Sequence, residues 1–154
     1  MIDTTSQPLA RAVAKDSVPE GSRSSRPLDG VLWIIQGLLG AMFVGTSVWK
    51  LTTPLPELAA KMPWMGEVSP SFVYATAVLD LLGGLGVLLP SLTRVRPQLT
   101  VLAALGCVAL MIGAILFHIS RGELANTPFN FLVAALSAFV AWGRHGRGAI
   151  AARA

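Results

Sequence analysis

The chain has 154 residues, enough for one domain, and carries a formal net charge of +4. Hydrophobic residues make up 53% of it and charged residues only 13%, whereas soluble domains are about 25% charged. This balance excludes an ordinary soluble domain and indicates a protein surrounded by lipid. The twelve Lys and Arg residues lie at the edges of apolar runs and form no basic stripe interleaved with aromatics, so no nucleic-acid partner is expected.

Residues 1–27 are polar and rich in Ser, Pro and charges of both signs. They contain no apolar stretch of the kind that a cleavable signal peptide needs. Because they also have too few apolar side chains to fold, we predict a disordered cytoplasmic tail.

Long apolar runs follow at residues 32–49, 72–89, 99–119 and 129–142. The first three are long enough to cross a hydrocarbon core of about 30 Å, and the fourth is marginal unless it tilts or the bilayer thins. No run has a polar face, which argues against a soluble helical bundle. The sequence therefore predicts an all-α fold: a four-helix transmembrane domain over residues 28–145, followed by a cytoplasmic C-terminal tail over 146–154.

Small residues recur along the predicted helices and indicate where their backbones approach closely. In the first helix Gly37, Ala41 and Gly45 are spaced by four residues, which places them on one stripe. We expect the same role for five glycines of the second and third helices: Gly83, Gly84, Gly86, Gly106 and Gly113.

Basic residues predict the orientation, because cytoplasmic loops carry the excess of Lys and Arg. One side of the predicted bundle has nine: Arg11, Lys15, Arg23, Arg26, Arg94, Arg96, Arg144, Arg147 and Arg153. The other side has three: Lys50, Lys61 and Arg121. We therefore expect both termini in the cytoplasm and a location in the bacterial plasma membrane.

Asp80 is the most informative position, because it lies about 15 Å inside the second predicted helix. A carboxylate there costs about 2.5 kcal/mol or more unless it is neutralised or paired. It is either a functional group, as a proton relay or ligand anchor, or a structural contact between helices with Lys50, Gln36 or Thr46. With upright helices Lys50 is offset from Asp80 by about 10 Å along the membrane normal, so a bridge would need tilt or an intervening water.

Further polar residues gather at the outer ends of the third and fourth predicted helices: His118, Glu123, Asn126 and Asn130. Together with Lys50 they predict a polar vestibule that opens outward above Asp80. The spacing offers no recognisable metal-ligand set, so no metal site is expected. The single cysteine, Cys107, excludes an internal disulfide and is expected to pack in the core.

Several segments resemble the DoxX-like family of small bacterial membrane proteins. They are Lys-Met-Pro-Trp at 61–64, Leu-Asp-Leu-Leu-Gly-Gly-Leu-Gly-Val-Leu-Leu-Pro at 79–90, Pro-Gln-Leu-Thr-Val-Leu-Ala at 97–103, His-Ile-Ser-Arg-Gly-Glu at 118–123 and Phe-Val-Ala-Trp-Gly-Arg at 139–144. The resemblance covers about residues 30–145 and implies a four-helix membrane bundle. The family takes its name from a subunit of a thiosulfate:quinone oxidoreductase, so the resemblance implies a link to membrane redox complexes. The family usually has glutamate where this chain has Asp80.

Three functions remain open on this basis. The first is a membrane subunit of a redox system, with quinone as the cofactor that the resemblance allows and an oxidoreductase as its partner. The second is a small proton-coupled transporter, which would be expected to form a homodimer because four helices make a thin pathway. The third is a structural or assembly subunit without chemistry. The chain carries no redox-cofactor motif of its own, so an enzymatic role would depend on a partner.

Overall fold

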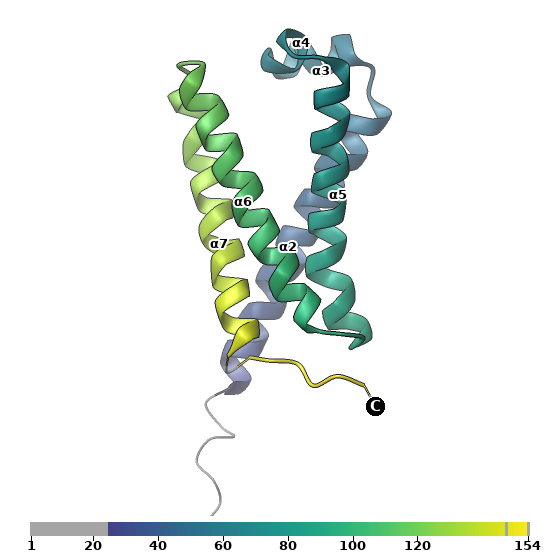
Figure 1. Cartoon of the computed structure of the whole chain (residues 1–154), viewed down its shortest axis with the longest axis vertical. Coiled ribbons are helices and arrows are strands. Elements are labelled where there is room, and N and C mark those ends of the chain that lie inside the picture. The colour runs from purple at the N-terminus through teal and green to yellow at the C-terminus, as the bar shows by residue number, and fades with distance from the viewer. Residues whose placement is uncertain (1–24, 147, 154) are drawn as a thin grey trace, which may run out of the picture.

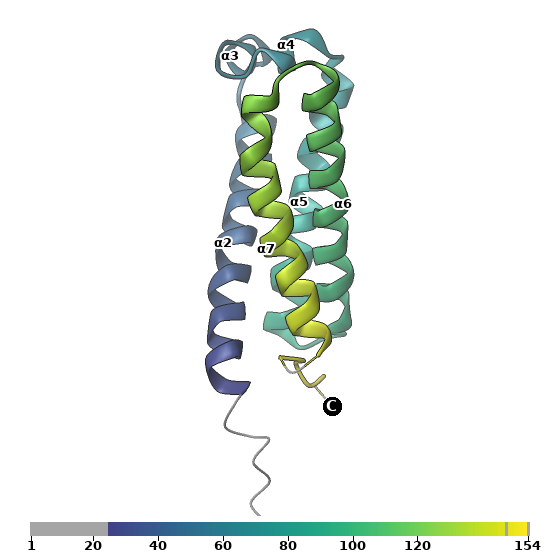
Figure 2. The ribbon, with the colours of Figure 1, turned by 90° about the vertical axis from the view of Figure 1, so that its left-hand side faces the viewer.

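The computed structural model describes residues 25–146 and 148–153. Four long helices run side by side in alternating directions: α2 (Ser25–Thr52), α5 (Pro70–Thr93), α6 (Gln98–Ser120) and α7 (Thr127–His145) (Figures 1 and 2). Three short helices lie in the connections at one end: α3 (Leu55–Lys61), α4 (Trp64–Glu67) and the 3₁₀ helix η2 (Leu124–Asn126). The described residues contain no strand, and the predicted four-helix bundle is confirmed.

The predicted N-terminal tail falls mostly outside the described residues. α2 begins at Ser25, a little before the predicted domain start at residue 28. At the other boundary α7 ends at His145, as predicted.

Four helical segments are long and apolar enough to cross a membrane: Pro27–Thr52, Pro70–Thr93, Gln98–Ser120 and Leu124–His145, the last of which includes η2. Their outer faces carry large apolar side chains that no part of the described chain covers. Leu38 is 64% exposed, Leu102 66% and Leu116 61%. Apolar surface of this extent is unfavourable in water, so these faces contact lipid and the protein is a multi-pass membrane protein.

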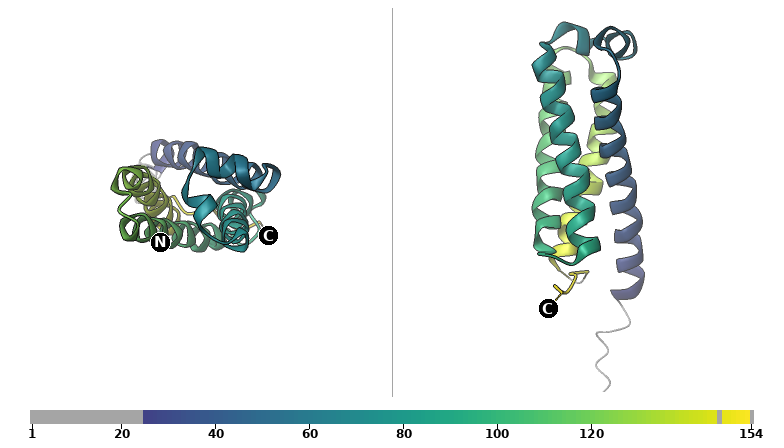
Figure 3. Two further views of the ribbon diagram at one scale, coloured as in Figure 1. Left: turned by 90° about the horizontal axis from the view of Figure 1, so that it is seen from above. Right: turned by 90° about the vertical axis from the view of Figure 1, so that its right-hand side faces the viewer.

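The helices associate as two antiparallel pairs. α2 packs extensively on α5 and α6 packs extensively on α7, with α5 and α6 joining the pairs (Figure 3). The pairs diverge towards the end that carries α3 and α4 (Figure 1). The main core lies between the four helices and includes Leu39, Phe43, Val87, Cys107 and Val133. A smaller core of Leu58, Met65 and Val73 holds the α3–α4 connection against the top of α5.

Glycines allow close approach in the bundle, but on a different stripe of α2 from the predicted one. Gly37 and Gly45 have no neighbour within 4 Å of an added Cβ, and Ala41 is exposed. Their stripe therefore faces away from the other helices, and the prediction for it was wrong. The contact runs instead through Gly40, where a Cβ would overlap the Leu88 side chain. Periodicity alone could not identify the face of α2 that meets α5.

The glycines of α5 and α6 divide in the same way. A Cβ on Gly84 would lie 3.0 Å from the carbonyl oxygen of Gly40, and Cβ atoms on Gly83 and Gly86 would press on Cys107 and Ala103. The prediction for these three residues is confirmed. Gly106 and Gly113 have open space around them, so their predicted packing role was wrong.

We expect Gly40→Leu to destabilise the bundle by about 1–3 kcal/mol or more, because the new side chain must displace Leu88 from the α2–α5 contact. Gly45→Leu is the matched control, since it adds the same side chain to an open face of the same helix. Thermal unfolding in a mild detergent, followed by circular dichroism, measures both variants. Equal melting temperatures would contradict the assignment of the two faces.

Candidate functional site

Lys50 of α2 and Asp80 of α5 form an ion pair inside the bundle. Lys50 Nζ lies 2.8 Å from Asp80 Oδ2, and the two side chains are only 9% and 8% exposed. Lys50 Nζ also donates a hydrogen bond to Thr76 Oγ1 at 3.2 Å. The cost of placing a carboxylate at this depth is therefore offset by a direct counter-charge, as is common for ionisable groups in membrane segments.

The direct contact corrects the predicted 10 Å offset, and the reason is the register between the two helices. Gln36 fixes that register near the opposite end, where its Nε2 donates to Val87 O at 2.7 Å and to Ser91 Oγ at 3.1 Å. Counted from Gln36, Lys50 lies 14 residues further along α2. Counted from Ser91, the partner of the Gln36 side chain, Asp80 lies 11 residues back along α5. The difference of three residues is about 4.5 Å of helix, which a lysine side chain can span. The α3–α4 connection permits this register between α2 and α5, because it lets α5 begin further out from the centre of the bundle than the point where α2 ends.

Trp64 of α4 lies between this ion pair and the ends of α6 and α7. Lys50 Nζ is 5.9 Å from the centroid of the Trp64 ring. On its other side the ring makes edge contacts with Phe117, at a centroid distance of 5.6 Å, and with His118 at 6.5 Å. The next residue, Met65, is fully buried and anchors α4 in the smaller core. The short helix therefore positions an indole ring next to the buried charges.

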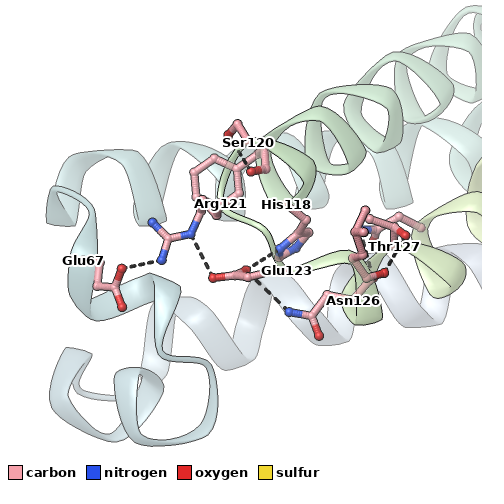
Figure 4. Close-up of polar contacts among 10 residues, drawn as sticks. Glu67, His118, Ser120, Arg121, Glu123, Asn126 and Thr127 are labelled. Atoms are coloured by element: carbon pink, nitrogen blue, oxygen red, sulfur yellow. Dashed lines mark hydrogen bonds and ion pairs between the residues drawn. The ribbon is translucent and has the colours of Figure 1, made fainter.

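A second group of charged residues lies near the membrane surface (Figure 4). His118 Nδ1 is 2.7 Å from Glu123 Oε2, and Arg121 Nε donates to Glu123 Oε1 at 2.9 Å. Arg121 also binds Glu67 of α4, and Asn126 Nδ2 reaches Glu123 at 3.5 Å. The hydrogen bond from His118, and then that from Arg121, hold the pKa of Glu123 below its usual range. Glu123 is therefore ionised at neutral pH and organises the connection between α6 and α7.

The structure brings together four of the five candidate residues predicted from sequence. Lys50 and Asp80 form one pair, and His118 and Glu123 form another, with Trp64 between them. Asn130 does not join either pair, since its Nδ2 donates to Asn126 O one turn earlier at 3.4 Å.

Sequence analysis missed three contributors to this region: Thr76, Glu67 and the contact role of Trp64. Trp64 belongs to the segment 61–64 that resembles the family, but this resemblance did not indicate what its ring contacts. Glu67 and Thr76 become informative only when the register between helices is known.

A second buried polar network, at the opposite end of the bundle, was also not predicted. Arg144 of α7 is 4% exposed; its Nε donates to Gln36 Oε1 at 2.5 Å and its Nη1 binds Asp29 and the carbonyl oxygen of Gly148. The guanidinium carbon lies 4.9 Å from the centroid of the Trp33 ring. Arg144 was counted only among the basic residues of the cytoplasmic side, and Gln36 was one of three alternatives for a partner of Asp80. Of these alternatives Lys50 is the one that binds Asp80, and Gln36 binds Arg144 instead.

Metal binding finds no support in the described part of the chain, where no three His, Cys, Asp or Glu side chains gather to hold an ion. Cys107 is buried in the main core, where its Sγ lies against Gly83.

A sequence profile described as the DoxX-like family matches residues 34–140, which is most of the chain. The chain belongs to the DoxX-like family. The match includes both ion pairs of the candidate site, whereas Asp29 and Arg144 of the opposite network lie outside it. No curated protein and no solved structure gives a significant match to the chain. Membership of the DoxX-like family supports an integral membrane protein, and the function has to be argued from the site.

We expect Asp80→Asn to destabilise the protein by about 3 kcal/mol, because it leaves the Lys50 ammonium buried without its counter-charge. Lys50→Met should have an effect of similar size, because it leaves the Asp80 carboxylate buried without its counter-charge. The double variant Lys50→Met/Asp80→Leu should recover most of the loss, since replacing a whole buried pair by apolar residues is close to neutral. Thermal unfolding of the wild type and the three variants in detergent gives the stabilities that a double-mutant cycle compares. A double variant that is as unstable as the sum of the singles would show that the two side chains do not act as a pair.

Proposed function

We propose that this protein is a membrane subunit of a quinone-linked redox system in the bacterial plasma membrane, with both termini in the cytoplasm. The observation that carries the proposal is the buried Lys50–Asp80 pair, which Trp64 connects to the His118–Glu123 pair near the membrane surface. This arrangement provides a hydrogen-bond donor inside the membrane, flat aromatic surfaces beside it and proton-exchanging groups above it.

The residues fit the chemistry of a quinone. A quinone supplies two-electron, two-proton chemistry when it is bound, and its carbonyl oxygens accept hydrogen bonds. The Lys50 ammonium has three N–H groups, of which two donate to Asp80 and Thr76, so one is left for a carbonyl oxygen. Asp80 keeps that ammonium charge-balanced in the low-dielectric interior.

The aromatic side chains would border the quinone ring. Trp64 and Phe117 lie edge to face, and Phe72 stacks on Phe117 at a centroid distance of 5.8 Å. Such rings favour offset or edge contacts with another flat ring. His118 shares a hydrogen bond with Glu123, in the group of charged residues at the end of α6.

Electrons would have to come from another protein, because the chain has no sequence motif for a redox cofactor. An oxidoreductase that docks on the membrane surface is the partner that this proposal requires.

The ion pair also bears on the alternative of a proton-coupled transporter. A proton carrier must lose and regain its charge, but Asp80 is bound directly to a lysine. Transport through Asp80 would therefore require the pair to open in every cycle, whereas ligand binding to Lys50 does not.

Two observations support the proposed orientation. The excess of Lys and Arg in the tail and the α5–α6 connection is typical of the cytoplasmic side. The start of α2 and the end of α7 lie at the same end of the bundle, as an even number of spans requires (Figure 2).

We expect a reporter that is active only in the cytoplasm to work when fused at either terminus and to fail when inserted beside Lys61. A periplasm-specific reporter at the same three places should give the opposite pattern. Activity of the cytoplasmic reporter at Lys61 would invert the proposed orientation, and termini on opposite sides would contradict the span count.

We expect the purified protein, supplemented with excess quinone and washed in mild detergent, to retain quinone that solvent extraction and absorbance can measure. Lys50→Met/Asp80→Leu should retain about tenfold less, the effect of losing one hydrogen bond from a charged donor. Lys61→Met is the control, because it removes an exposed lysine from the same end of the bundle. Equal retention by the wild type and the double variant, or no retention by the wild type, would overturn the quinone proposal.

A further inference from the structure

A cavity of about 1040 Å³ lies at the end of the bundle opposite the candidate site. It is open on one side and is lined by the end of α5, the first turns of α6, the end of α7 and the non-helical residues 149–152. Its wall has a polar part, which includes Ser91, Arg96 and His145, and an apolar part along one face of α6, which includes Leu102 and Leu105. A ligand that fits both parts is an amphiphile.

The polar part of the wall is cationic. Arg96, Arg144 and His145 line the cavity, and no Asp or Glu of the described part of the chain does. Asp29 binds Nη1 of Arg144 on the side that faces α2. Nη2 of the same guanidinium is buried and has no hydrogen-bond partner within residues 25–146 and 148–153. The positive charge of this wall favours an anionic ligand, and Arg96 and His145 are exposed enough to contact one.

The beginning of α6 adds to the attraction for an anion. Its N-cap is Pro97, and no side chain caps the first turn. The N–H groups of Leu99 and Thr100 donate to Arg96 O at 2.9 Å and Pro97 O at 3.1 Å, so the N–H of Gln98 is the one left for an anion, where the helix dipole is positive. Pro97, Gln98 and Leu99 of this turn line the cavity. A phosphate group is well suited to such a helix terminus.

The backbone before α6 holds Arg96 in this position at an energetic cost. Arg94 and Arg96 have φ angles of 58° and 48°, in the left-handed region that is unfavourable for residues other than glycine. The carbonyl oxygen of Arg94 accepts a hydrogen bond of 3.0 Å from the backbone N–H of Arg153, which ties the C-terminal segment across the cavity. Strain of this kind is often associated with a binding site.

The depth of the cavity matches the headgroup layer of the membrane. Trp33 and Trp142 lie at the same end of the bundle, and Trp142 is 64% exposed, as interfacial tryptophans are. Leu102 and Leu105, which continue the cavity along α6 towards the membrane centre, are 66% and 52% exposed and so face lipid.

We propose that this cavity binds an anionic phospholipid, with its phosphate at Arg96, His145 and the start of α6 and an acyl chain along Leu102 and Leu105. The lipid seals the open side of the bundle where α5, α6 and the C-terminal segment meet. This site is separate from the quinone proposal and does not depend on it.

Native mass spectrometry of the full-length protein, titrated with phosphatidylglycerol or phosphatidylcholine in a lipid-stripping detergent, tests the assignment. The wild type should retain phosphatidylglycerol at least about tenfold better than phosphatidylcholine, because only the first presents net negative charge. Arg96→Gln/His145→Gln should lose this preference. Lys61→Gln, which removes a positive charge from the opposite end, should keep it.

Thermal unfolding confirms that the variants are folded before the lipids are compared. Ala149→Trp, which fills the cavity without changing its charge, should also reduce the retention of phosphatidylglycerol. Equal binding of the two lipids by the wild type, or unchanged preference in the double variant, would overturn the proposal. Addition of inorganic phosphate at millimolar concentration separates the two sources of the anion. Continued retention of phosphatidylglycerol supports a lipid site, and displacement by phosphate would assign the cavity to a free anion instead.

Discussion

The relative positions of the four helices depend on a chain of buried hydrogen bonds that begins at Arg144. Arg144 binds Gln36, Gln36 binds Ser91, and Ser91 Oγ lies 2.8 Å from Thr100 Oγ1. These four side chains belong to four different helices. Apolar helices in lipid can slide past one another at little cost, because lipid solvates their surfaces as well as a neighbouring helix does. Polar side chains that must find partners remove this freedom, since an unpaired polar group in hydrocarbon costs several kcal/mol.

The candidate site follows from this register. Gln36 fixes α2 against α5 near one end, and this alignment brings Lys50 within reach of Asp80 near the other end. Glycines at positions 40 and 84 bring the two helices close together between these contacts. A change at Gln36 would therefore act on the ion pair, although the two sites lie about 21 Å apart along α2.

The fold was predictable because its cause is composition and run length, both of which are read directly from a sequence. Four long apolar runs were enough for the number and type of the helices. It was also predictable that Lys50, His118 and Glu123 lie in one region, because all three come near the helix ends on the same side of the bundle. The exact contacts were not. The rotation of α2 decides whether Gly40 or Gly45 meets α5, and the register of α2 against α5 decides whether Lys50 reaches Asp80. Both depend on side-chain contacts between distant parts of the chain, and the Arg144–Gln36 bond joins residues 108 positions apart.

The divergence of the two helix pairs leaves few contacts between them near α4. On that side Arg121 binds Glu67, and Trp64 touches Phe117 and His118. The Glu67 side chain is 58% exposed, in contrast to the 8% of Asp80. Dissolved ions screen an exposed ion pair strongly and a buried one much less. Ionic strength outside the membrane is therefore expected to weaken the Arg121–Glu67 contact and to affect the Lys50–Asp80 contact much less, so high salt loosens one of the contacts between α4 and the end of α6.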